Sequence, residues 1–323
     1  MPSSAEPRFL AGPVTVTVPA TSANLGPGFD SLGLALSLRD TLVAEVLDDT
    51  GAEVTSRVAG EPSHMLYIEV DGAGSDTVAR DESHLVVRAM RAAWDRMGIA
   101  QPEGLRLSCT NVIPHARGLG SSSAAIVGGI VLARALVEGG ACLLPDAAAF
   151  QLAAEIEGHP DNVAPALYGG FAISGRDAGP DGGQGFYAVG SPVAEGIGVI
   201  VFVPPVGVET KVARGLLPAE VPHADAAADA GRTALLVAAL AGRPDQLLRA
   251  TRDFLHQEYR RPAMPESLAL VDVLRTGGVP AIVSGAGPTV LAFTTGEEDL
   301  ASRCPAGWDV HVLRVESVGA SVV

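Results

Sequence analysis

One short stretch of the chain concentrates glycine and serine in front of a run of small residues: Pro114-His115-Ala116-Arg117-Gly118-Leu119-Gly120-Ser121-Ser122-Ser123-Ala124-Ala125. Glycines let the backbone approach an anion closely, serines can cap a helix, and the free N–H groups of a first helical turn point at negative charge. The stretch has neither the Gly-Lys-Ser/Thr ending of a Walker A loop nor the spacing of a dinucleotide-binding loop. It therefore predicts a phosphate-binding loop of another kind, with an ordinary strand-to-helix turn as the alternative.

A second polar loop, residues 19–30, follows the alternating segment Val14–Val18, which predicts a half-buried strand. Asn24 and Asp30 lie in this loop among glycines and prolines. A polar loop at the end of a buried strand is a good position for contacts to a ligand. The alternative is a tight turn in which both side chains bond only to their own backbone.

A third cluster lies at the end of a helix that we expect to run from about 145 to 157, and it holds Glu155, Glu157, His159, Asp161 and Asn162. Magnesium prefers carboxylate oxygens and keeps several waters, so one glutamate together with nucleotide phosphates suffices to hold it. A carboxylate at a helix C-terminus is unfavourable unless a cation compensates. Glu157 is therefore the better candidate for a metal ligand, and Glu155 fits a solvated acidic face.

A fourth segment, the glycine-rich turn at 284–289, lies between two apolar stretches. It either only connects two strands of a hairpin or packs its backbone against a substrate or a loop of the first half.

Together the four segments resemble the GHMP kinase family, which is named for galactokinase, homoserine kinase, mevalonate kinase and phosphomevalonate kinase and whose three motifs follow one another in chain order. The three family motifs correspond to residues 19–30, 114–123 and 284–289, so the resemblance covers nearly the whole chain. The homoserine kinase branch is the most similar, because the first segment is that branch's version of the motif. Three further segments also resemble it, the last two more loosely: 159–165, 210–214 and 259–260.

The resemblance implies an α+β GHMP kinase fold, with an N-terminal ribosomal-protein-like domain at 13–175 and a C-terminal ferredoxin-like sandwich at 190–323. It implies ATP and Mg²⁺ as cofactors, and transfer of the γ-phosphoryl group to the side-chain hydroxyl of L-homoserine in threonine biosynthesis. Glu157 and Ser122 are the expected metal ligands, with Ser121 and Ser123 as alternatives to Ser122. The expected ATP-binding residues are Pro114, His115, Ala116, Arg117, Gly118, Leu119, Gly120, Ser121, Ser122, Ser123 and Ala124.

The same branch implies a site for an amino acid. A guanidinium can hold a carboxylate with two hydrogen bonds, so Arg214 and Arg260 suit the substrate carboxylate, with Arg261 as the competitor of Arg260. Asp30 suits the ammonium group. The remaining substrate-binding residues are Asn24, His159 and Asn162.

Asn24 and Asn162 are the expected catalytic residues. An amide cannot accept a proton at neutral pH, so the hypothesis is that Asn162 orients the hydroxyl and that its proton leaves to a phosphate oxygen. Asp161 is the rival base.

Departures from the branch leave other points open. Ser83-His84 stands where the branch usually has an Asn, so the contacts to adenine are open. His115 and Arg117 either steer ATP or, as we expect, face solvent. Two other functions remain: a kinase for another small alcohol, such as mevalonate or shikimate, and a non-catalytic binding or regulatory protein of this fold.

Composition sets the class of protein. A chain of 323 residues suggests two domains, and its formal net charge of −15 argues against binding to nucleic acid or anionic membranes. Cys109, Cys142 and Cys304 are widely spaced and predict buried thiols in a reducing compartment. With no recognisable signal peptide and no apolar run of membrane-spanning length, we expect a cytoplasmic protein. The resemblance adds a possible homodimer.

Periodicity predicts further elements in mixed order, which favours two α+β units over a doubly wound sheet. We expect the domains to change near the glycine- and aspartate-rich run 175–185, which predicts a flexible surface loop. The expected strands are 33–47, 53–58, 65–70, 105–109, 197–203, 279–283, 289–294 and 309–315. The expected helices are 84–97, 122–137, 145–157, 231–241, 245–256 and 265–276.

Overall fold

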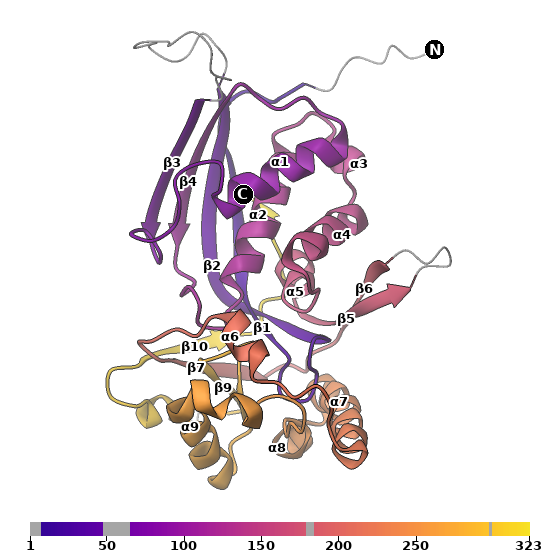
Figure 1. Ribbon diagram of the computed structural model, residues 1–323, viewed down its shortest axis with the longest axis vertical. Coiled ribbons are helices and arrows are strands. Elements are labelled where there is room, and N and C mark those ends of the chain that lie inside the picture. The colour runs from indigo at the N-terminus through magenta and orange to yellow at the C-terminus, as the bar shows by residue number, and fades with distance from the viewer. Residues whose placement is uncertain (1–7, 48–64, 179–183, 297–298) are drawn as a thin grey trace.

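The computed structural model describes residues 8–47, 65–178, 184–296 and 299–323, and it holds two β-sheets, each covered by helices (Figure 1). The first sheet runs in the order β11-β1-β2-β4-β3. Strand β5 pairs with the first residues of β2, and β6 pairs with β5. The 16-residue strand β2 organises this sheet, because β1, β4 and β5 all pair with it. The strands are β1 (Val14–Ala23), β2 (Leu32–Leu47), β3 (Met65–Gly72), β4 (Gly104–Asn111), β5 (Phe171–Ala178), β6 (Gln184–Ser191) and β11 (Ser321–Val322).

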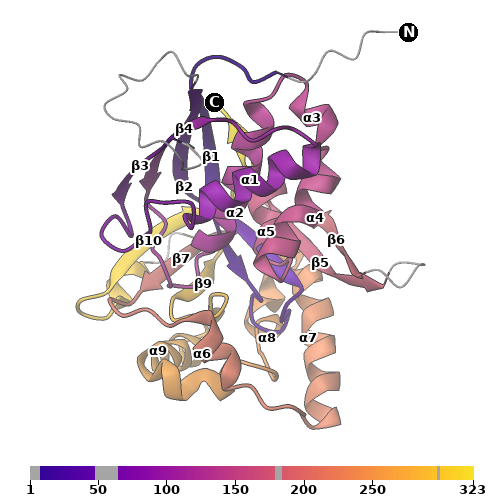
Figure 2. The ribbon, with the colours of Figure 1, turned by 45° about the horizontal axis from the view of Figure 1, so that its top comes forward.

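Helices cover one face of this sheet, as the turned view shows (Figure 2). They are α1 (Leu85–Met97), α2 (Ser121–Ala135), α3 (Gly140–Leu143), α4 (Asp146–Glu157) and α5 (Val163–Tyr168). Helix α2 packs against α1, α4 and β1. It lies so close to the sheet that a Cβ on Gly128 would be 2.3 Å from the side chain of Leu42 on β2. This close approach aims the first turn of α2, and with it the serine run, at the junction of the two sheets.

The second sheet has the order β10-β7-β9-β8 with every neighbouring pair antiparallel. Its strands are β7 (Gly198–Val203), β8 (Ala281–Val283), β9 (Val290–Thr294) and β10 (Asp309–Arg314). Helices α6 (Thr210–Gly215), α7 (His223–Gly242), α8 (Leu247–Ala250) and α9 (Pro265–Thr276) lie between β7 and β8, with the 3-10 turns η1 (Pro244–Gln246) and η2 (Glu258–Ala263). This strand order is that of a split β-α-β sandwich. In the described part of the connection from β9 to β10, the helical structure is one 3-10 turn, η3 (Ala301–Arg303).

Most expected elements are present, and the exceptions have physical causes. The helix expected at 245–256 is wrong beyond Ala250, because Asp253 accepts hydrogen bonds from the N–H groups of residues 255–257 and turns the chain. The loop expected at 175–185 is wrong for 175–178 and 184–185, which belong to the hairpin of β5 and β6. The strand expected at 53–58 lies outside the described residues.

The chain crosses between the two sheets more than once. Strand β6 extends the first sheet to Ser191, and β11 returns to pair with β1 after the second sheet is complete. The division at 13–175 and 190–323 therefore stays a prediction, with β11 as a part of the second range that lies in the first sheet.

The cysteines are less uniform than expected. Cys109 is buried, Cys304 is partly exposed and Cys142 is exposed, so the prediction of buried thiols holds only for the first. Across the described ranges, the structure holds no helix of the length and apolarity that crossing a bilayer requires.

Candidate active site

The glycine- and serine-rich stretch forms a loop from the end of β4 to the start of α2. The N-cap residue of α2 is Gly120 with φ of 72°, and no side chain caps the helix, so the expected serine caps are wrong. The hydroxyls instead donate to one carboxylate: Ser122 Oγ to Glu157 Oε2 at 2.8 Å and Ser123 Oγ to Glu157 Oε1 at 2.7 Å. The N–H groups of the first turn have no acceptor within the helix and remain available to an anion.

Gly120 is required where it stands. A Cβ there would lie 1.9 Å from Thr21 Oγ1 and 3.2 Å from Asn162 Oδ1. These two atoms form a hydrogen bond of 2.8 Å, with the threonine donating. The glycine- and serine-rich loop therefore packs directly against the Thr21–Asn162 hydrogen bond, which orients the Asn162 amide.

Residues of the C-terminal half of the chain hold this loop in place through hydrogen bonds. Arg117 donates to the carbonyls of His115, Pro204 and Pro205, so the expectation that it faces solvent is wrong. Ser284 Oγ donates to Gly118 O at 2.7 Å. The turn at 284–289 thus connects β8 to β9 and also packs against the glycine- and serine-rich loop, which combines both alternatives for this segment.

Asp40 anchors the entrance of the loop, a role that the sequence did not indicate. Its Oδ1 accepts hydrogen bonds from Val112 N at 2.7 Å and from Ile113 N at 2.9 Å. Burial raises the pKa of Asp40 to about 6, although these two N–H groups lower it. The carboxyl therefore titrates near neutral pH in the folded protein.

We expect Asp40 to make the protein less stable as the pH rises. A pKa raised above the unfolded value of 3.8 contributes stability that is complete below about pH 4 and lost as the pH rises through about 6. Asp40→Asn keeps an acceptor oxygen but carries no charge, so its free energy of unfolding relative to the wild type should rise by about 2–3 kcal/mol between pH 4 and pH 7.5. Urea unfolding of both proteins at pH 4 and pH 7.5 measures this. A constant difference between the two proteins would contradict the assignment.

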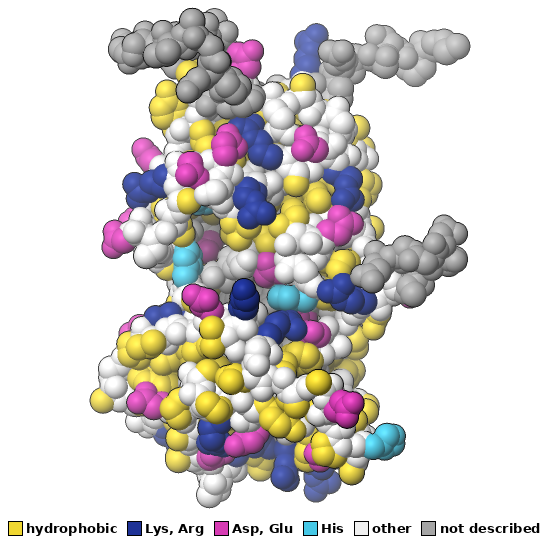
Figure 3. Space-filling model, in the orientation of Figure 1, with side chains coloured by type: hydrophobic (Ala, Val, Ile, Leu, Met, Phe, Trp, Pro, Cys, Tyr) yellow, Lys and Arg dark blue, Asp and Glu magenta, His cyan; other side chains and the backbone are white. Residues whose placement is uncertain are grey.

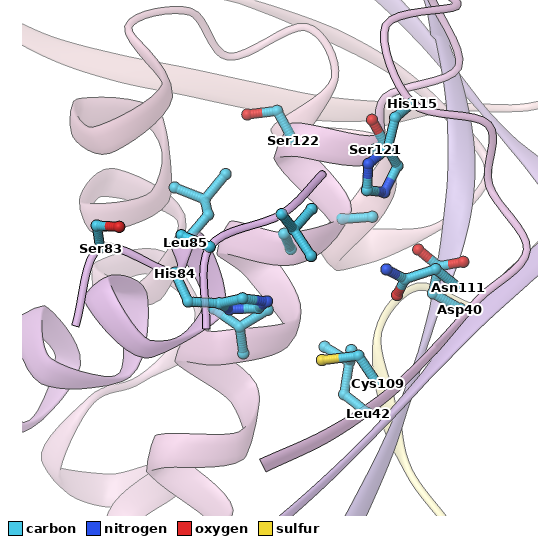
Figure 4. A pocket seen from close by; sticks show the side chains of 15 residues that line it. Asp40, Leu42, Ser83, His84, Leu85, Cys109, Asn111, His115, Ser121 and Ser122 are labelled. Carbon is cyan, nitrogen blue, oxygen red and sulfur yellow. The ribbon is translucent and has the colours of Figure 1, made fainter. Parts of the chain in front are cut away.

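An apolar cavity of about 330 Å³ lies between α1, β2, β4 and the start of α2 (Figure 4). His84 reaches into it opposite Asp40 and Asn111, and neither imidazole nitrogen of His84 has a hydrogen-bond partner among the described residues. Burial, followed by the nearby His115, lowers the pKa of His84. His115 lines the same cavity, so the expectation that it faces solvent is wrong. Further lining residues that sequence analysis did not find are Leu42, Val78, Val86, Cys109 and Ala125.

A polar cavity of about 280 Å³ adjoins the apolar one, since Ser121 and Ser122 line both. In the space-filling view, charged and histidine side chains gather across the middle of the molecule, between the upper and lower halves of the picture (Figure 3). The polar cavity brings together most of the expected site residues: Asn24, Ala116, Gly118, Gly120, Glu157, His159, Asp161, Asn162, Arg214 and Arg260. The expected residues Pro114, Arg117, Leu119, Ser123 and Asp30 line neither cavity.

The loop after β1 wraps the floor of the polar cavity. Asn24, Leu25 and Asp30 have φ between 51° and 65°, a backbone conformation that costs non-glycine residues about 1 kcal/mol or more each. Asn24 stabilises it by accepting from Asp30 N and by donating from Nδ2 to Gly285 O at 2.9 Å. The alternative of a tight turn whose side chains bond only to their own backbone is therefore correct for one of these two bonds, because Asn24 also donates to Gly285 in the C-terminal half of the chain.

Two arginines and one carboxylate meet beside this loop. Arg214 forms two hydrogen bonds with Asp30, of 2.5 and 3.0 Å, which raise the pKa of Arg214. Arg260 is buried, and burial followed by the nearby charge of Arg214 lowers its pKa to about 10. Arg261 is not part of the cavity, because it pairs with Glu258 and Asp272.

His159, Asp161 and Asn162 form the opposite wall. The Nδ1 of His159 lies 2.8 Å from Asp161 Oδ1, which also accepts from Asn162 N. Burial would lower the pKa of His159, but the hydrogen bond and the charges of Asp161 and Glu157 raise it above its ordinary value. Asp161 thus accepts hydrogen bonds from two neighbours. Thr21 donates to Oδ1 of Asn162, and within the described ranges the amide nitrogen of Asn162 makes no hydrogen bond.

Comparisons with known proteins agree with this geometry. The family models for the GHMP kinases N terminal domain and for the GHMP kinases C terminal match residues 84–170 and 235–306. A homoserine kinase from Streptomyces avermitilis is 52% identical over 99% of this chain and 98% of its own. The chain belongs to the homoserine kinases of the GHMP kinase family. Another homoserine kinase, from Clavibacter michiganensis, is 45% identical over 96% of this chain and 93% of its own.

Solved structures place the fold in the same family. A homoserine kinase from Cytophaga hutchinsonii superposes with a TM-score of 0.78 at 27% identity, covering 98% of this chain and 99% of that chain. Mevalonate kinase from L. major in complex with R-mevalonate shares the fold, with a TM-score of 0.64, 14% identity and coverage of 97% and 99%. The GHMP kinase fold expected from the sequence is confirmed, and the chain is an ATP-using kinase.

Proposed function

We propose that this kinase transfers the γ-phosphoryl group of ATP to the side-chain hydroxyl of L-homoserine, and that it does so in the two adjoining cavities. The observation that carries this proposal is the charge at and beside the polar cavity: Arg214 and Arg260 line it and suit a carboxylate, and Asp30, which is bound to Arg214, suits an ammonium group. Mevalonate and shikimate have a carboxylate but no ammonium group, so neither would use Asp30.

The apolar cavity suits the nucleobase. Its lining combines aliphatic side chains with a few polar ones, and His84 offers one donor and one acceptor that no described residue uses. The phosphates would follow the shared edge at Ser121 and Ser122 toward the N–H groups of the first turn of α2. Phosphoryl transfer depends mainly on such positioning and charge neutralisation.

The donor set beside the phosphate loop fits Mg²⁺. Glu157 supplies a carboxylate and Ser122 a hydroxyl, both lining the polar cavity, and this ion commonly takes one or two protein oxygens while keeping waters and phosphate oxygens. When bound, the ion would neutralise charge on the phosphates. Ser123 binds the other oxygen of Glu157 from a buried position and so orients the carboxylate.

The substrate would lie between the two polar walls. Arg214 and Arg260 bind the carboxylate, and Asp30 exchanges part of its bond with Arg214 for the ammonium group. The free amide N–H of Asn162 donates to the hydroxyl or to the transferring group and fixes its approach. Because this amide cannot take a proton, the hydroxyl proton passes to a phosphate oxygen. A cytoplasmic location and a homodimer stay predictions from the sequence.

A coupled assay of ADP release tests the function. We expect turnover with L-homoserine at least about 10³ times more efficient, in kcat/KM, than with mevalonate, shikimate or galactose, since each lacks one or both charged groups. Faster turnover of mevalonate or shikimate would support the other-alcohol kinase instead. No turnover with any of the four would refute the proposed substrate.

A further inference from the structure

His256 touches no reacting group in the proposed function, yet its imidazole is fully buried between two parts of the site. The Nε2 atom lies 2.7 Å from Gly26 O, in the loop that carries Asn24, and Nδ1 lies 3.0 Å from Arg260 Nη1. A carbonyl oxygen only accepts and a guanidinium only donates. The two contacts therefore admit one form of the ring, the neutral tautomer with its proton on Nε2.

The surroundings of His256 support this neutral form. Burial lowers its pKa, although the carboxylate of Asp253, 3.5 Å from Nε2, raises it. The positive charge of Arg260 next to Nδ1 also disfavours a second ring proton. The ring of Phe29 lies 5.1 Å from that of His256, centre to centre, and packs against both Arg214 and Arg260. The imidazole is thus fixed in orientation as well as in protonation.

This fixed acceptor determines how Arg260 is presented. Its Nη1 is used twice inside the protein, by His256 Nδ1 and by Gly285 O, both at 3.0 Å. Neither Nε nor Nη2 makes a hydrogen bond to a described residue, and Nε is buried. Since Arg260 lines the polar cavity, its edge formed by Nε and Nη2 is the one left to a ligand.

We propose that His256 is the positioning residue for the substrate carboxylate: its unprotonated Nδ1 holds Nη1 of Arg260 and so reserves the Nε–Nη2 edge for that carboxylate. The Nε2–H bond to Gly26 ties the Asn24 loop to the same guanidinium. This inference rests on the proposed function in one respect, that Arg260 binds the carboxylate of an amino acid.

Two substitutions separate the two bonds of the ring. Asparagine at 256 can place an oxygen near the Nδ1 position, whereas glutamine can place an N–H near the Nε2 position. We expect His256→Gln to raise KM for homoserine about tenfold, the loss expected when a hydrogen bond to a charged group is misaligned. Its kcat and its KM for ATP should stay within about twofold, and His256→Asn should change KM for homoserine by no more than about threefold.

Thr251→Val is the matched control. Like the His256 ring, the Thr251 hydroxyl is buried and hydrogen-bonded, but its partners are Leu247 O and Arg275, not Arg260. We expect this variant and the two His256 variants all to lower Tm, and only Thr251→Val to leave KM for homoserine unchanged. In an Arg260→Lys background, His256→Gln should add no further rise in KM.

Equal KM values for the Asn and Gln variants, a further rise in the Arg260→Lys background, or a rise in KM with Thr251→Val would each overturn the positioning role. The wild type in the same assay tests the proposed function separately. Failure of the wild type to turn over homoserine would refute that function and this inference together, whereas failure of the variant pattern alone refutes only the inference.

Discussion

Glu157→Gln is expected to lower kcat for homoserine phosphorylation by about 10³-fold while the protein stays folded. The carboxylate lies beside the first turn of α2, and its two oxygens accept from Ser122 and Ser123, so glutamine can keep one of these bonds but loses the charge. The same variant should need a higher Mg²⁺ concentration for half-maximal activity. Steady-state rates at several Mg²⁺ concentrations, with a thermal melt of each protein, measure both effects.

Glu155→Gln is the matched control, since Glu155 lies two residues earlier on α4 and pairs with Arg96 on the surface. A surface ion pair contributes about 0–1 kcal/mol, so this variant should keep kcat within about twofold. If both substitutions lower kcat alike, the assignment of Glu157 as the metal ligand is wrong.

Asn162→Ala should lower kcat by about 10²-fold, whereas Asp161→Asn should keep it within about tenfold of the wild type. Thr21 donates to the amide oxygen of Asn162, and the amide nitrogen makes no hydrogen bond to a described residue, so it can donate to a ligand. Asp161 instead has its Oδ1 bound by His159 and by the N–H of Asn162. Rates and KM values for both substrates separate the two roles.

Loss of kcat in Asp161→Asn alone, with KM unchanged, would instead make Asp161 the base and end the mechanism without a carboxylate base. Thr21→Val serves as the finer variant of this pair. It removes the donor that fixes the amide, so kcat should fall less than in Asn162→Ala and KM for ATP should change little.

Much of the site could be predicted because its residues lie in loops whose composition is unusual. The serine run, Asn24 and the cluster around Glu157 each have glycine or proline neighbours, and they converge on one cavity as expected. Asp40 and His256 could not be found this way, and His84 was noticed only because Ser83-His84 departs from the homoserine kinase branch. Each lies in or beside regular structure, and its importance comes from partners far away in the chain or from having none.

The fold shows the same limit. Helix α9 and strand β7 have a clear period and were predicted within one residue. The hairpin of β5 and β6 was not, because glycines replace the alternating pattern there, and the two-residue strand β11 exists only through its pairing with β1. Asp30 and Arg214 were expected to bind opposite ends of a substrate, and sequence gives no means to see that they bind each other first.

The contacts of the glycine- and serine-rich loop also affect how the molecule unfolds. Arg117, Ser284 and Thr289 join this loop to the strands and turns of the second sheet through hydrogen bonds to backbone atoms. Unfolding of either half would break these hydrogen bonds and so remove the contacts that hold the loop in place. We therefore expect one cooperative transition on heating, in which a bound nucleotide stabilises both halves together. Two sheets then behave as a single thermodynamic unit, whatever boundary is drawn between them.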